Sequence, residues 1–242
     1  TIRDAAGNNA TLTLASPGAS NSLGANKALI VDTTVPTLSS SSPADGATSV
    51  GVNANIVLTF SETVVAGSGN ILISTGSSSD GGFESIPVGN AKVSISSNVV
   101  TINPAGTFAS STAYNVQVPA TAFDDAAGNS YAGITNATTL NFSSADVVAP
   151  TISSVTSTTA NGAYKAGDEI VITITFSENV YVNYDNGRPR LTFETGSYDQ
   201  QRNYTSGSGG TVLTWTYIVA SGNTSSDLDV QSTTALALNG GT

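Results

Sequence analysis

The sequence contains no cysteine, no histidine and no methionine. Without cysteine the chain can form neither disulfide bonds nor thiolate metal sites, and without histidine it lacks the commonest general base. Carboxylates, serine, lysine and tyrosine remain, but nothing around the acidic pair Asp227 and Asp229 indicates the raised pKa and substrate cleft that a glycosidase needs. The sequence therefore predicts a protein without catalytic activity.

Basic residues are also scarce. The chain of 242 residues contains seven lysines and arginines and 17 acidic residues, which gives a formal net charge of -10. Such a surface repels nucleic acid and attracts divalent cations. No apolar run approaches the roughly 18 residues that a membrane span needs. The sequence therefore predicts neither nucleic-acid binding nor a membrane span.

Short alternating segments fill most of the chain. Residues 54–60 (ANIVLTF) and 169–176 (EIVITITF) place apolar side chains at every second position, and residues 211–219 place Trp215 and Tyr217 on one face. Clusters of Gly, Ser and Asn separate these segments, and no helical period is visible. The pattern predicts an all-β chain of antiparallel sandwiches, with both aromatic side chains in a core.

The pattern occurs twice along the chain. Phe-Ser-Glu occurs at 60–62 and again at 176–178, and the motif Asp-x-x-x-Pro occurs at 32–36 and at 146–150. These recurrences predict a first domain over 34–146 and a second over 147–242. The turn DAAGN at 125–129 also has a copy at 4–8, followed by the strand-like NNATLTL at 8–14. In the middle copy this turn ends a domain, so residues 1–33 are predicted to be terminal strands.

The second predicted domain lacks its last strands. A sandwich without them exposes unpaired backbone groups along a sheet edge and leaves its core open. The sequence therefore predicts that the N-terminal segment of a neighbouring copy completes the second domain. Two arrangements are compatible with this: strand donation between separate copies, head to tail, and covalent continuation of a tandem array.

Two stretches carry a resemblance to a known family. SSSPADGATSVGVNANIVLTFSETV resembles the bacterial Ig-like domains of surface-layer and secreted proteins. DLDVQSTTALALNGG, joined to TIRDAAGNNATLTL, is similar to a module repeated in giant bacterial adhesins. The resemblance implies two Ig-like sandwiches in an extracellular, non-enzymatic extension module that calcium often stiffens at its domain ends.

Acidic residues gather near the expected domain ends, where calcium could take six to eight oxygen ligands. Turn formation explains the same residues without a metal, because Asp and Asn bond their own backbone. The sequence predicts two clusters of candidate calcium ligands: Glu62 with Asp124, Asp125 and Asp146, and Glu178 with Asp4 and Asp32.

The function that these features favour is that of a structural repeat in an extracellular bacterial fibre or adhesin stalk, with copies of itself as partners. The alternative is a carbohydrate-binding module that uses surface glycans as partners. It depends on four tyrosines of the second domain: Tyr181, Tyr184, Tyr198 and Tyr204. Saturable binding on a glycan array would favour the alternative, although cross-strand packing also explains tyrosines in a sheet.

Overall fold

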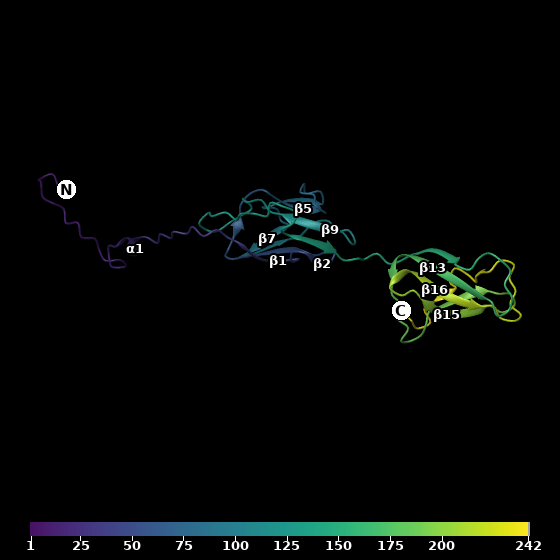
Figure 1. Cartoon of the computed structure of the whole chain (residues 1–242). Coiled ribbons are helices and arrows are strands. Elements are labelled where there is room, and N and C mark those ends of the chain that lie inside the picture. The colour runs from purple at the N-terminus through teal and green to yellow at the C-terminus, as the bar shows by residue number, and fades with distance from the viewer. Residues whose placement is uncertain (242) are drawn as a thin grey trace. The chain divides into compact units, whose positions relative to one another are not determined.

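The computed structural model describes residues 1–241, and the chain divides into two compact units, Thr1–Val147 and Val148–Thr242. Both units consist of strands, as the sequence predicts, and the helical exception is the four-residue helix α1 (Leu23–Asn26). No helix among the described residues is long and apolar enough to cross a bilayer. Figure 1 labels the main strands of each unit.

Unit 1 contains two main sheets and a small two-stranded one. The first has the order β1 (Leu38–Ser42), β3 (Ile56–Phe60), β8 (Val99–Ile102), β7 (Val93–Ser96). The second has the order β2 (Ala47–Val50), β11 (Asn141–Ser144), β9 (Ala113–Gln117), β5 (Asn70–Thr75), β6 (Glu84–Pro87). The small sheet pairs β4 (Val65–Ala66) with β10 (Phe123–Asp124).

The core of unit 1 lies between the two main sheets. On β3 the side chains of Ile56, Leu58 and Phe60 are buried while the two between them are half-buried, which is the alternation that the sequence predicts. Aromatic rings fill one end of the core, where Phe142 of β11 packs edge-on against Phe108 at 5.2 Å between ring centroids. Burial of both sheet faces stabilises this sandwich.

The strand pair β2–β11 has an unusual direction. These two strands run parallel, with Phe142 opposite Ala47 and Ser144 opposite Val50, whereas β11 is antiparallel to its other neighbour β9. β1 and β2 follow one another in sequence but belong to different sheets, so the chain changes sheets between Ser42 and Ala47. β11 is thus held along both of its edges.

Residues 1–35 precede the first sandwich, and nearly all of them are exposed. The predicted strand at 8–14 does not form a ladder: its single bridge joins Asn9 to Arg3, and Leu12 and Leu14 are 69% and 90% exposed. A strand needs a partner to satisfy its backbone groups, and no neighbouring strand accompanies this segment in the described chain. The segment has the apolar alternation of a strand, but its apolar side chains are not buried.

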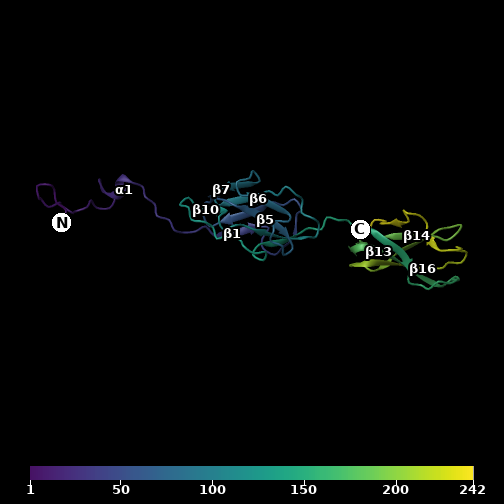
Figure 2. The ribbon, with the colours of Figure 1, turned by 90° about the horizontal axis from the view of Figure 1, so that it is seen from above.

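Unit 2 is built from one sheet that has the order β12, β13, β16, β15, β14, β17, and β18 also pairs with β14. The strands have these bounds: β12 (Ile152–Ser157), β13 (Glu169–Val180), β14 (Arg190–Glu194), β15 (Gln200–Ser206), β16 (Gly210–Ile218), β17 (Asp229–Val230) and β18 (Leu236–Ala237). Figure 2 shows β13, β14 and β16 from above.

The core of unit 2 forms around Trp215, which is completely buried, and Tyr217, which is 2% exposed. This confirms the prediction that both are core residues. Ten buried apolar side chains make up this core, against 20 in unit 1. The edge strand β12 is exposed at every position. Unit 2 therefore has the smaller and more open core.

Candidate metal centre

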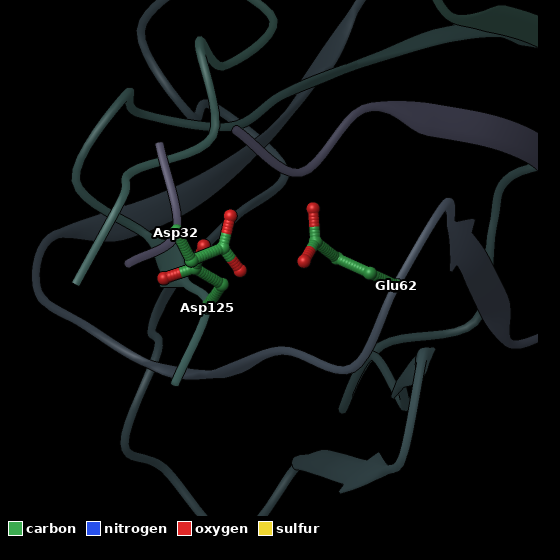
Figure 3. Close-up of side chains that lie close together, drawn as sticks. All are labelled: Asp32, Glu62 and Asp125. Atoms are coloured by element: carbon green, nitrogen blue, oxygen red, sulfur yellow. The ribbon is translucent and has the colours of Figure 1, made fainter. Parts of the chain in front are cut away.

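Three carboxylates of unit 1 converge at one end of its sandwich. Asp32 precedes the first strand, Glu62 follows β3 and Asp125 follows β10, and their nearest oxygens all lie within 4.8 Å of one another. Figure 3 shows the carboxylate of Glu62 directed toward those of Asp32 and Asp125. Asp125 is buried, Glu62 is half-buried and Asp32 is exposed, so the group opens to solvent on one side.

The turn DAAGN fixes the position of Asp125. Its Oδ1 accepts hydrogen bonds from the backbone N–H of Ala127 at 2.8 Å and of Asn129 at 2.7 Å, and its Oδ2 accepts one from Asn129 Nδ2 at 2.7 Å. Gly128 closes the turn with a φ of 90°, a conformation that favours glycine. The same Asn129 Nδ2 donates to the backbone carbonyl of Asp32 at 3.1 Å. Asn129 thus connects the linker to the turn.

The pKa values of the two inner acids shift in opposite directions. The side-chain hydrogen bond from Asn129, followed by backbone donors, holds the pKa of Asp125 below its ordinary value. Desolvation raises the pKa of Glu62, and the negative charges of Asp125 and Asp32 raise it further. Ionised Glu62 is therefore repelled by its neighbours, and a bound cation would offset that repulsion.

The geometry of the three acids is compatible with calcium. Two oxygens that bind one calcium ion at 2.3–2.6 Å can be at most about 5.2 Å apart, and the spacing here is within that limit. Three carboxylates supply part of the six to eight oxygens that calcium takes, and water or backbone carbonyls would supply the remainder. Asp32, Glu62 and Asp125 are the residues that would hold the ion.

The structure groups the predicted acids differently from the sequence. Asp32, predicted with Glu178 and Asp4, lies with Glu62 and Asp125 instead. Asp146, predicted with Glu62, accepts a hydrogen bond from Ser110 Oγ at 2.8 Å. β11 is antiparallel to β9, so the end of β11 that precedes Asp146 lies beside the start of β9, whereas Asp125 follows the far end of β9. The two linker acids of unit 1 are therefore at opposite ends of the sandwich.

The remaining predicted acids lie outside this group of three. Asp124 accepts a hydrogen bond from Ser130 Oγ, and Asp4 is exposed in its own turn, bonded to Asn8. Glu178 is a half-buried residue of β13 and belongs to unit 2, whereas Asp4 and Asp32 belong to unit 1. The predicted second cluster of Glu178, Asp4 and Asp32 is not among the groups that the described residues bring together.

The four tyrosines that were considered for glycan contact differ in exposure. Tyr181 and Tyr198 are 78% and 82% exposed, and Tyr184 is 47% exposed. Tyr204 is only 4% exposed and packs edge-on against Trp215 at 5.8 Å. The prediction of a surface role was wrong for Tyr204, because its position on β15 faces the core.

Two sheets packed around one apolar core, without a disulfide, define unit 1 as an Ig-like β-sandwich. Residues 32–144 match the family model of the bacterial Ig-like domain, and unit 1 is consistent with a domain of this kind, as the resemblance in the sequence predicted. The family suggests a structural domain of bacterial surface proteins and is typically non-catalytic. The curated proteins include no match to the chain.

Proposed function

We propose that the chain is a mechanical, non-catalytic module of an extracellular bacterial fibre or adhesin stalk, extended by further copies of itself. The observation that carries this proposal is the path of the chain through unit 1. It enters at Asp32, beside Glu62 and Asp125, and leaves past β11 at Asp146, at the opposite end of the sandwich. Tension along the fibre would therefore act along the strands.

The parallel pair β2–β11 suits this load. Tension that enters at Asp32 reaches β2 through β1, and pulling the start of β2 one way and the end of β11 the other way shears the hydrogen bonds between these two strands. These bonds share the load and must break together, whereas bonds at a peeled edge break one after another. The bacterial Ig-like family of residues 32–144 supports a place on the cell surface or in a secreted fibre.

Pulling on single molecules of the full chain tests the mechanical role. We expect unit 1 to unfold in one step at a higher force than unit 2, because the strand pairs in the described part of unit 2 are all antiparallel. Extension of residues 37–144 should release about 35–39 nm of chain, less the folded length. If unit 1 unfolds at a force no greater than that of unit 2, the proposed role is refuted.

Calcium at Asp32, Glu62 and Asp125 is a further part of the proposal, and Glu62→Gln tests it. A carboxyl group with a raised pKa in the folded state binds more protons folded than unfolded. The free energy of unfolding therefore falls as pH rises from the ordinary pKa of Glu62 through its raised pKa, and the loss is complete above it. At pH 7 in chelator, Glu62→Gln should therefore raise the melting temperature of unit 1. In calcium the same variant should lower it relative to the parent, because a ligand is lost.

Asp199→Asn is the matched control, since Asp199 is exposed and lies outside the group of three acids. Because Asp199 belongs to unit 2, this variant should show the same effect of calcium on the melting temperature of unit 1 as the parent chain does. If calcium leaves the melting temperature of the parent chain unchanged at low ionic strength, the three acids are turn and surface residues without a metal.

A further inference from the structure

Unit 2 has an open space, here named the strand slot, between β17 and residues 163–166. β17 pairs with β14 along one edge, through Val230 opposite Phe193, and is the last strand in the order of the sheet. A cleft of about 520 Å³ adjoins this place and is lined by residues 159–164 and by residues 223–228, which directly precede β17. The core residues Ile170, Ile172 and Tyr217 also line it.

The corresponding space in unit 1 is filled by a strand. Residues 113–117 (AYNVQ) and 227–231 (DLDVQ) align, and each pairs in the same register: Val116 lies opposite Ile73 as Val230 lies opposite Phe193. Residues 44–51 (ADGATSVG) likewise align with 160–167 (ANGAYKAG). In unit 1 these two segments form β9 and β2, and β11 lies between them.

The backbone on both sides of the strand slot differs accordingly. In unit 1 the Val116 N–H donates to the carbonyl of Leu140 at 2.9 Å, whereas the Val230 N–H donates to the side chain of the adjacent Asp229 at 2.7 Å. Residues 47–50 form a strand against β11, but residues 163–166 lie outside any strand and are exposed. The segments on both sides of the slot therefore correspond to segments that, within unit 1, pair with β11.

A segment that suits the slot is present at the start of the chain. Residues 4–8 form the same turn as 125–129: the N–H of Asn8 donates to Asp4 Oδ1 at 2.8 Å, and Asn8 Nδ2 donates to Oδ2 at 2.8 Å. Gly7 has a φ of 88°, close to the 90° of Gly128. The turn that precedes the apolar segment is therefore formed by residues 4–8 themselves.

The apolar side chains of this segment are exposed, although their counterparts in unit 1 are buried. Residues 2–8 align with 123–129 through the shared turn, and residues 9–16 align with 137–144 after a gap, because residues 130–136 have no counterpart; this alignment pairs each large apolar residue with a core residue. The exposures are 65% for Ile2 against 0% for Phe123, 69% for Leu12 against 2% for Leu140, and 90% for Leu14 against 2% for Phe142. Exposed apolar side chains at alternate positions indicate a strand that is buried against a partner.

We propose that residues 1–16 of a second copy of this chain insert into the strand slot of unit 2. The register of unit 1 places Leu14 of the second copy opposite Leu228 and Thr13 of the second copy opposite Asp229, with the carbonyl of Leu12 of the second copy accepting from the Val230 N–H. The inserted strand runs antiparallel to β17 and parallel to residues 163–166. This inference names the partner of the proposed stalk module and rests on that proposal.

A synthetic peptide of residues 1–16 tests the insertion. The acceptor is the full chain carrying Leu12→Asp and Leu14→Asp, which cannot donate its own segment but keeps unit 2 unchanged, since both leucines are exposed in unit 1. We expect saturable binding by calorimetry, together with slower hydrogen exchange at residues 163–166 and 228–231. A control peptide with the same two substitutions should bind at least about 100-fold more weakly.

The inference would be overturned if the parent peptide did not bind at millimolar concentration, or if protection were confined to unit 1. Either result leaves the unfolding force of unit 1 unaffected, so it is distinguishable from a failure of the mechanical role. Equal binding of the parent and control peptides also refutes insertion, because burial of Leu12 and Leu14 is what the slot requires.

Discussion

Phe142→Ala is expected to lower the free energy of unfolding of unit 1 by about 3–5 kcal/mol, the range for removing a buried aromatic ring. Phe142 is 2% exposed, and its ring contacts two others: Phe108 at 5.2 Å and Tyr114 at 5.7 Å between centroids. These contacts close the end of the core between the sheets. Truncation removes them and leaves a cavity that the paired strands around it cannot fill.

Urea unfolding followed by circular dichroism measures this loss, and the fluorescence of Trp215, the single tryptophan, reports unit 2 separately. The matched control is Leu14→Ala at micromolar concentration, because Leu14 aligns with Phe142 but is 90% exposed. It should change stability by less than about 0.5 kcal/mol. A loss below about 1 kcal/mol for Phe142→Ala would show that this ring does not hold the end of the core.

The strands of both units could be predicted from their apolar alternation. Residues 54–60 contain β3, and residues 169–176 form most of β13, which continues to Val180. The alternation also identified Trp215 and Tyr217 as core residues, because a strand has only two faces. Tyr204 was the exception, since the pattern of β15 alone does not say which of its faces meets the core.

The grouping of the acids could not be predicted from the repeat alone. The repeat shows that Asp32 and Asp146 are equivalent linker residues, but both adjoin the same sandwich, and only the directions of β9 and β11 decide which of them meets Asp125. Strand direction depends on contacts between segments far apart in sequence. Local motifs therefore named the ligand candidates and left their partners undetermined.

The burial of the strand-like segment 8–14 also could not be predicted from its local sequence. Its alternation is that of a buried strand, yet its leucines are exposed, because burial needs a second surface that the segment does not contact. The comparison with Leu140 and Phe142 suits the proposed insertion, in which the second surface belongs to unit 2 of another copy.

A circular permutant tests this explanation within one molecule. In the permutant, residues 1–31 follow residue 242, so that the segment can reach the strand slot of its own unit 2. Burial of Ile2, Leu12 and Leu14 contributes about 1.5–3 kcal/mol for each side chain, and the entropy of ordering the segment offsets part of this gain. We expect a net stabilisation of unit 2 by about 2 kcal/mol, which corresponds to roughly 10 °C in its melting temperature.

The fluorescence of Trp215 follows the melting of unit 2, because this side chain is buried at the centre of its core. The permutant carrying Leu12→Asp and Leu14→Asp is the control and should melt with the parent chain. Unit 1 should keep its own melting temperature in both permutants, since Asp32 and its bond to Asn129 are retained. Equal melting of unit 2 in the parent and the permutant would mean that the slot accepts some other occupant, and that the exposed leucines of residues 1–16 have a different partner.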